Sequence, residues 1–184
     1  MNMDLRSFLG EARQLGPDYF VSIDKPVDPV LETCVIQQKL AAEGRFPAIR
    51  MENIKGAELP LATNILGSYS LLGLALGVDP GEPKSTILQR FRDRAAAPLE
   101  PQPVPRDTAP VKQVVLTGDD IDLAKLPIVH HAERDSGKYI TVGVLILRDP
   151  DSGVLNAGMY RHEVQGKDKL GCMFNPTHHA GYIY

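Results

Sequence analysis

The chain has 184 residues, of which 43% are apolar and 23% are charged, and its formal net charge is −3. Such a chain is globular and long enough for one large or two small domains. The weakly acidic balance leaves no basic footprint for nucleic acid, and the longest apolar run, residues 71–78, is too short to cross a bilayer.

Helix and strand signals alternate through the first 97 residues. Apolar residues at helical spacing, Gly16-Pro17 as a stop and Asp28-Pro29 as a start are the clearest of these signals. The expected helices cover residues 5–15, 28–43 and 85–96, with Ser85 as a cap, and a helix or buried turn-and-helix covers residues 64–77. The expected strands cover residues 19–23 and 48–54. This alternation predicts an α/β domain over residues 1–97.

A proline-rich segment follows at residues 98–110, with five prolines in thirteen positions. Such a composition favours extended, stiff backbone, so we expect a linker between two domains there. A surface strap across a single domain is the alternative. Beyond it, residues 111–116 are expected to form a strand that begins a second domain, residues 111–184. Adjacent His130 and His131 would point to opposite sides of a strand, so at most one of them is expected near a site.

The last third of the chain has the pattern of an antiparallel meander. Apolar, β-branched runs surround two turns, at residues 149–153 and 166–169. A tight second turn places Asn156 opposite residue 178 or 179, with strand pairing expected to hold through Phe174 and to end near Pro176. An amide oxygen and an imidazole nitrogen can share a divalent cation. The alternative is that Asn156 serves a turn and His178 is an ordinary loop histidine.

The ordered set of motifs in this region resembles the UbiD-like decarboxylases, which use prenylated flavin mononucleotide (FMN). The matching words are KYITVG at 138–143, Asn156-x-Gly158-x-x-Arg161, Pro176-Thr177-His178, and upstream Asp122-Leu123, Leu126-Pro127 and DSGKY at 135–139. The resemblance implies an α+β fold, in which the N-terminal α/β domain is followed by the first part of an antiparallel split β-barrel of the flavin-binding type. It also implies a reversible (de)carboxylase that acts on an aromatic or α,β-unsaturated carboxylic acid.

The resemblance further implies roles for particular residues. Asn156 and His178 correspond to two of the three protein ligands of a divalent metal, usually manganese, that clamps the cofactor phosphate; K+ is a further ion that the resemblance allows. His179 is the alternative to His178 for this role. The strand pairing is uncertain by one residue, and both members of the histidine doublet, His178 and His179, are therefore candidates. Arg161 corresponds to the catalytic arginine and also contacts the cofactor. The remaining cofactor-binding positions are Thr141, Gly158, Met159 and Thr177.

The family's third metal ligand and both catalytic glutamates lie downstream of this histidine, so we expect the chain to be inactive alone. It is expected to be truncated, naturally short or part of a split enzyme; a non-catalytic flavin-phosphate and metal-binding module is the alternative function. The implied partners are a small carboxylic acid substrate, a flavin prenyltransferase that supplies the cofactor, and further copies in a homo-oligomer. Two cysteines without C-x-x-C spacing and the lack of an apolar signal core predict a cytoplasmic protein that does not associate with membranes.

Strand geometry raises one difficulty for these roles. Asn156 and Arg161 are five residues apart, about 16–17 Å along an extended strand. An odd separation points the two side chains to opposite faces of an ideal strand. We therefore expect a bulge or a strong twist between them, most easily at Gly158.

Overall fold

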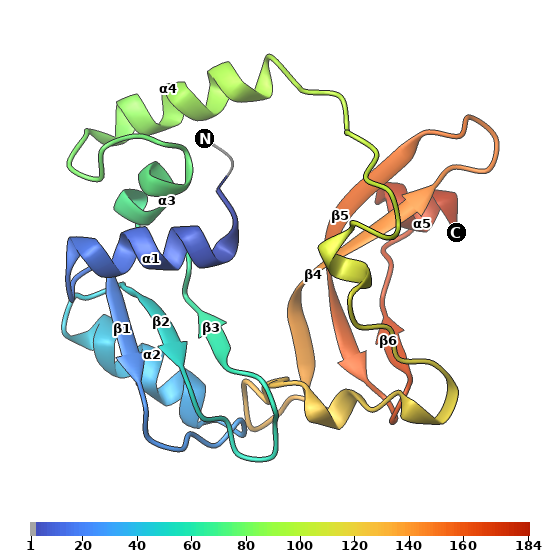
Figure 1. Cartoon of the computed structure of the whole chain (residues 1–184), viewed down its shortest axis with the longest axis horizontal. Helices are drawn as coiled ribbons and strands as arrows, with labels where there is room; N and C mark the ends of the chain where they lie inside the picture. Colours follow the sequence, from blue (N-terminus) through green and yellow to red (C-terminus); the bar gives the residue numbers. More distant parts are fainter. Residues whose placement is uncertain (1–2) are drawn as a thin grey trace.

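The structure is a computed structural model that describes residues 3–184, and it consists of two halves that each contain a three-stranded sheet (Figure 1). The elements of the first half are α1 (Leu5–Leu15), β1 (Phe20–Ile23), α2 (Glu32–Ala42), β2 (Ala48–Met51), β3 (Leu61–Thr63), α3 (Tyr69–Ala75) and α4 (Lys84–Ala95). Those of the second half are β4 (Tyr139–Arg148), β5 (Leu155–Val164), β6 (Leu170–Cys172) and α5 (His179–Ile183). The mixed first half and the antiparallel second half confirm the α+β expectation.

The first sheet is covered differently on its two faces. It has the strand order β1-β2-β3, with β1 parallel and β3 antiparallel to β2. Alternate residues of β2 enter two cores: Ala48 packs with α1 and α3, whereas Ile49 and Met51 pack on the side of α2. The helices α1 and α2 lie on opposite sides of the sheet in Figure 1. This layered arrangement follows from the period-two alternation of β2.

Several local expectations for the first half were wrong in detail. The helix α2 begins at Glu32 because the Asp28 carboxylate accepts a hydrogen bond from the Val30 amide at 2.8 Å, which forms a turn, and Leu31 follows at φ +67°. Ser85 is not a cap, since α4 begins at Lys84. The expected element at residues 64–77 is the shorter helix α3, capped by the Ser68 side chain, and the strand β3 before it was not expected.

The connection between the halves is exposed, and the expected strand at residues 111–116 was wrong. Short 3-10 helices occur at Pro110–Lys112, Gly118–Asp120 and Leu123–Lys125. Val111 and Val114 are 80% and 77% exposed. Pro110 occupies the first helical turn and fixes its φ, and no strand among the described residues pairs with this segment.

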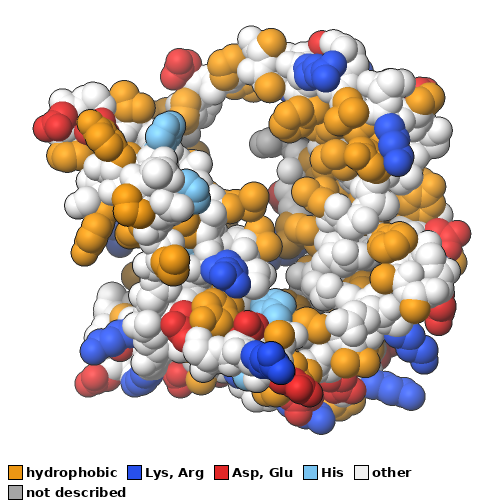
Figure 2. All heavy atoms as spheres, turned by 180° about the vertical axis from the view of Figure 1, so that it is seen from behind, with side chains coloured by type: hydrophobic (Ala, Val, Ile, Leu, Met, Phe, Trp, Pro, Cys, Tyr) orange, Lys and Arg blue, Asp and Glu red, His pale blue; other side chains and the backbone are white. Residues whose placement is uncertain are grey.

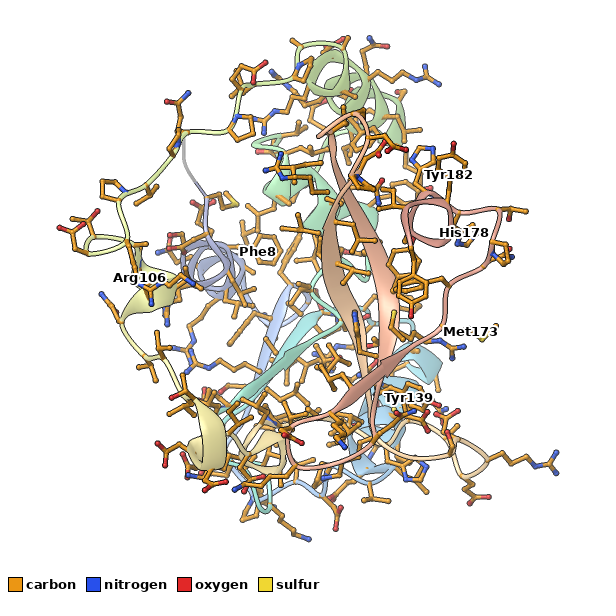
Figure 3. The ribbon with its side chains drawn as sticks, turned by 90° about the vertical axis from the view of Figure 1, so that its right-hand side faces the viewer. Phe8, Arg106, Tyr139, Met173, His178 and Tyr182 are labelled. Atoms are coloured by element: carbon orange, nitrogen blue, oxygen red, sulfur yellow. The ribbon has the colours of Figure 1, made fainter. Side chains whose placement is uncertain are left out.

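The second sheet is the predicted meander. β5 pairs with both β4 and β6, always antiparallel, and Val164 faces Leu170 across the tight turn. The ladder ends at Cys172 rather than at Phe174, so the expected extent of pairing was wrong by two residues. The next residue, Met173, is 88% exposed as the chain leaves the sheet toward α5 (Figure 3).

Backbone bonds join the halves at one end of the molecule. Val30 bridges His130, and the neighbouring Val129 bridges Tyr139 at the start of β4. The Glu58 amide donates to the Lys125 carbonyl at 3.0 Å. Away from these contacts an opening separates the halves, as the space-filling view from behind shows (Figure 2). Within residues 3–184, no helix is both long and apolar enough to cross a membrane.

Candidate functional site

The expected site residues lie on two different faces of β5. Side chains alternate regularly along this strand, so that Asn156 and Gly158 belong to a half-buried face while Met159 and Arg161 belong to an exposed one. Met159 is 72% exposed. The expected bulge at Gly158 is therefore wrong: the strand keeps its period of two, and five residues carry Asn156 and Arg161 to opposite sides.

The irregularity lies in the neighbouring strand instead. Ile140 pairs with His162 and Gly143 pairs with Tyr160, so Thr141 and Val142 together face the single residue Arg161. Two residues opposite one define a β-bulge, which bends its strand and increases the local twist. The structure thus brings two of the expected cofactor residues, Thr141 and Arg161, directly across from each other.

At the other end of β5, Asn156 meets the histidine doublet. The Asn156 side-chain oxygen lies 3.3 Å from Nδ1 of His179, the first residue of α5. The ring of His178 lies elsewhere, with its centroid 6.3 Å from that of Tyr160. Thr177 is exposed, and both its amide and its hydroxyl donate to the Asn175 side-chain oxygen, which shapes the loop that leads into α5. The contact to Asn156 is therefore made by His179 and not by His178.

This pair suits part of a divalent-metal site. An amide oxygen and an imidazole nitrogen are both ligands for manganese-type ions. Two ligands about 2.1 Å from an ion, at right angles to each other, lie roughly 3 Å apart. The distance of 3.3 Å from Asn156 to His179 is close to that separation. No group of three His, Cys, Asp or Glu side chains gathers for a metal within the described residues, so Asn156 and one histidine form an incomplete ligand set.

A polar cluster lies around Arg161 and includes Tyr139, which lies at the far end of the ribbon from His178 (Figure 3). The guanidinium carbon of Arg161 lies 5.8 Å from the ring centroid of Tyr139, within the range of a cation–π interaction. Ser136 is hydrogen-bonded to the Tyr139 hydroxyl at 2.6 Å and also donates to Glu163. The Ser136 hydroxyl, and then the Gln165 amide, hold the pKa of Glu163 below its usual range.

Glycines on the half-buried face make room for rings. A side chain at Gly158 would lie 2.7 Å from the ring of Tyr160, and one at Gly143 would lie 2.4 Å from the ring of His162. Phe174 packs edge-on against Tyr160, with the ring centroids 5.6 Å apart. Gly158 therefore allows the Tyr160 ring to lie across the sheet beneath the segment that carries the histidine doublet.

Two family models match nearly the whole of this architecture. Residues 17–91 match the 3-octaprenyl-4-hydroxybenzoate carboxy-lyase N-terminal domain. Residues 102–184 match the Rift-related domain of the same enzyme, UbiD. The chain belongs to the UbiD family. The two matches cover the sheet with α2 and α3 in the first half, beginning after α1, and the meander with its Asn156 site in the second.

UbiD-class structures share the fold closely. HmfF from Pelotomaculum thermopropionicum, in an evolved dimeric form in complex with prenylated FMN (prFMN), is 32% identical, with a TM-score of 0.86 over 99% of this chain and 40% of its own. Vanillic acid decarboxylase from Sedimentibacter hydroxybenzoicus, in its closed form, is 28% identical, with a TM-score of 0.91 over 99% of this chain and 39% of its own. A relative from Aquifex aeolicus (strain VF5), described as an uncharacterized protein, is 32% identical over 91% of this chain. The chain spans 37% of the length of that relative.

Sequence reasoning missed the cluster around Arg161. Tyr139 and Ser136 were noted only as parts of the KYITVG and DSGKY motifs. The signal that could have found this cluster is the position of Tyr139 relative to Gly143. A bulge just before Gly143 puts Tyr139 opposite Glu163, and Tyr139 then lies beside Arg161.

Proposed function

We propose that this chain forms the N-terminal, cofactor-holding part of a UbiD-type (de)carboxylase that acts on an aromatic or α,β-unsaturated carboxylic acid. The observation that supports the proposal is the contact between Asn156 and the histidine doublet at one end of β5. Arg161 lies five residues further along the strand, about 16–17 Å away and on its opposite face, so both side chains can face one cofactor only if the strand twists between them.

In this proposal Asn156 and one histidine of the doublet hold a manganese ion against the cofactor phosphate, and K+ is the other metal ion proposed for the cofactor site. His178 is the histidine of the family motif, and His179 is the one that contacts Asn156. Thr141, Gly158, Met159 and Thr177 are proposed to line the flavin site. Prenylated FMN, supplied by a flavin prenyltransferase, provides the electron sink for the loss of carbon dioxide.

Arg161 is the proposed catalytic residue of this chain. Its planar guanidinium matches a carboxylate in geometry and charge, so it can hold the carboxyl group of the substrate. The Tyr139 ring limits where the guanidinium can lie, because the two groups are 5.8 Å apart. Among the described residues, none of the ion pairs found involves Arg161, and its donors are available to a ligand.

The second candidate is a module that binds the flavin phosphate and the metal without turnover. The incomplete ligand set favours this alternative for the chain acting alone. In either case we propose that the complete enzyme assembles as a homo-oligomer in the cytoplasm.

The test uses the 184-residue chain with prenylated FMN and Mn2+. Binding is followed by flavin absorbance and by Mn2+ electron paramagnetic resonance, and turnover by release of carbon dioxide from an aromatic or α,β-unsaturated acid. Binding without release supports a cofactor-holding part that needs further groups for catalysis. Release by this chain would show that it carries a full catalytic set, and failure to bind either group would overturn the proposal.

A further inference from the structure

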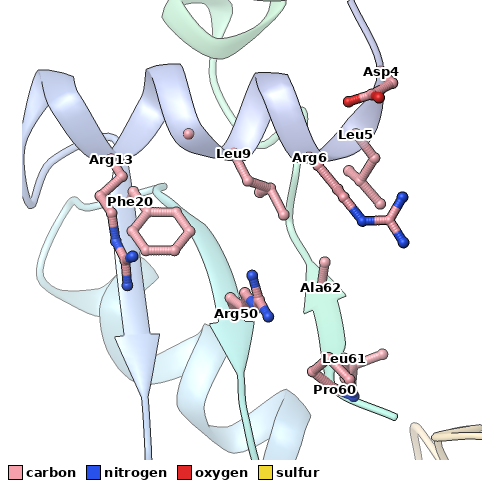
Figure 4. Close-up of a pocket in the computed structure, with 11 residues that line it drawn as sticks. Asp4, Leu5, Arg6, Leu9, Arg13, Phe20, Arg50, Pro60, Leu61 and Ala62 are labelled. Atoms are coloured by element: carbon pink, nitrogen blue, oxygen red, sulfur yellow. The ribbon is translucent and has the colours of Figure 1, made fainter.

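The first half contains a pocket that the proposed function does not use. It has a volume of about 440 Å³ and lies between α1 and the sheet β1-β2-β3 (Figure 4). A volume of this order is typical of small-molecule sites, which span roughly 300–1,000 Å³. Its eleven lining residues come from the end of the chain before α1, from α1, and from all three strands and the segment before β3.

The pocket exists because helices cover only part of this face of the sheet. Phe20 and Ala48 are buried beneath α1 and α3. One step further along the strands, Arg50 pairs with Ser22 on one side and with Ala62 on the other, on the same face as Ala48. This row contributes a cation, a hydroxyl and a methyl group rather than large apolar side chains, so α1 does not close over it.

Three arginines line this space, with Arg50 between Arg13 and Arg6 (Figure 4). Arg6 and Arg13 are seven residues apart on α1, which places them two turns apart on one face, about 10.5 Å along the helix. In Figure 4 Arg13 extends toward β1, Arg6 extends sideways near the start of α1, and Arg50 lies on β2 between them. Leu9, only 8% exposed, lies between the two helical arginines and forms an apolar wall.

Two of these cations are held in place by neighbours. The guanidinium carbon of Arg13 lies 5.1 Å from the centroid of the Phe20 ring. Nε of Arg50 lies 3.1 Å from Glu52, whose carboxylate also accepts from the Ser22 hydroxyl at 3.2 Å. These contacts engage one edge or one face of each guanidinium, and because a guanidinium carries five donors, others remain for a ligand.

The positive charge of the third arginine, Arg6, is less compensated by neighbouring negative charge. Among residues 3–184, Arg6 has no salt bridge within 4 Å. Asp4 also lines the pocket, but its carboxylate caps α1 by accepting from the Ser7 amide at 2.8 Å. The pocket therefore combines an excess of positive charge with apolar walls from Leu5, Leu9, Phe20, Leu61 and Ala62.

From this combination we infer that the pocket binds an amphipathic organic anion, a compact apolar body that carries one carboxylate head group. The head lies between Arg50 and Arg6, Arg13 adds positive charge at the other end of the pocket, and the body packs against Leu9 and the β3 wall. Arginine donors pair with a carboxylate in matched, charge-assisted geometry, and the apolar body gains by leaving water. The inference is independent of the proposed function, because none of the pocket residues belongs to the meander.

The test is a titration of the 15N-labelled chain with benzoate, monitored by amide chemical shifts. We expect saturable shifts that cluster at Gly10, Leu61 and Ala62. Acetate supplies the head without the body and benzyl alcohol supplies the body without the head, so each should bind at least about tenfold more weakly. Equal affinity for acetate and benzoate, or shifts that never saturate, would overturn the inference.

Two charge-removing variants localise the site. Arg50→Gln and Arg6→Gln should each weaken benzoate binding roughly tenfold, the loss expected for one charge-assisted hydrogen bond. Arg90→Gln, on the exposed surface of α4, is the matched control and should bind as the parent chain does. Arg6 is exposed, so the Arg6→Gln variant should fold normally. It therefore tests the inference even if Arg50→Gln disturbs the central strand of the sheet. Unchanged affinity in Arg6→Gln, with circular dichroism like that of the parent, would contradict the assignment.

Discussion

The side-chain oxygen of Asn156 and Nδ1 of His179 lie 3.3 Å apart, although 23 residues separate them in sequence. The contact forms because β5 turns into β6 and the chain then returns as the loop before α5. It places an oxygen and a nitrogen donor where one cation can join them. His178 is adjacent in sequence, but its ring lies beside Tyr160.

Titration of this chain with Mn2+ can show whether His178 or His179 is the metal ligand. From the observed contact we expect His179→Ala and Asn156→Ala to weaken Mn2+ binding at least tenfold, since each removes one ligand from a set that is already incomplete. His178→Ala should have a smaller effect. The measurement is the free-Mn2+ signal in electron paramagnetic resonance, with His131→Ala as a control outside the ribbon. A larger loss of Mn2+ affinity in His178→Ala would instead identify His178, the histidine of the family motif, as the metal ligand. In that case α5 would have to rotate when the metal binds.

The ring of Tyr139 should fix the orientation of the Arg161 guanidinium. In Tyr139→Leu we expect the Arg161 Nε–H resonance to lose its ring-current shift, because the aromatic face that lies 5.8 Å away is removed. Tyr139→Phe keeps the ring and loses only the hydroxyl that bonds Ser136, so most of the shift should persist. If both variants leave the Arg161 resonance unchanged, the two side chains do not interact in solution.

The meander was predictable because its signals are local. Turn residues at 149–153 and 166–169 bound alternating apolar runs, and the tight turn fixes the register of Val164 with Leu170. The approach of residue 156 to the doublet followed from that register. The choice between His178 and His179 could not follow, because it depends on where α5 begins and how it turns after the ladder ends at Cys172.

The features that were missed depend on tertiary partners. Residues 111–116 have strand-like composition but find no partner strand among the described residues and stay exposed. The bulge was expected at Gly158 because glycine permits one, yet the ring of Tyr160 fills the space above Gly158. The pocket residues Arg6 and Arg50 gave no sequence signal, since only the packing of α1 on the sheet brings them together. The domain limits 1–97, 98–110 and 111–184 remain predictions.

Acid should loosen the turn between β4 and β5. The Ser152 hydroxyl donates to the Asp149 carboxylate at 2.7 Å and the Asp151 amide donates at 2.9 Å, which lowers the pKa of Asp149. Because the pKa is lower in the folded chain, this contribution is present above the ordinary aspartate pKa and is lost as the pH falls through the lowered value. An NMR titration of the Asp151 amide should show that transition. Asp149→Asn should remove it, whereas Asp168→Asn, in the other turn, should leave it in place.

Close packing of α5 should depend on Gly181. A methyl group there would lie 2.3 Å from the Asn175 carbonyl oxygen and 3.0 Å from the Pro176 Cα, and both are backbone atoms that cannot rotate away. Gly181→Ala should therefore displace α5 or the loop before it, at a cost of about 1–3 kcal/mol. We expect faster amide exchange at Tyr182, loss of the Asn156–His179 contact and weaker Mn2+ binding. Gly137→Ala, where nothing lies within 4 Å of the added methyl group, is the matched control. Unchanged exchange and Mn2+ affinity in Gly181→Ala would mean that α5 does not pack against this loop in solution, and that the Asn156 site does not depend on it.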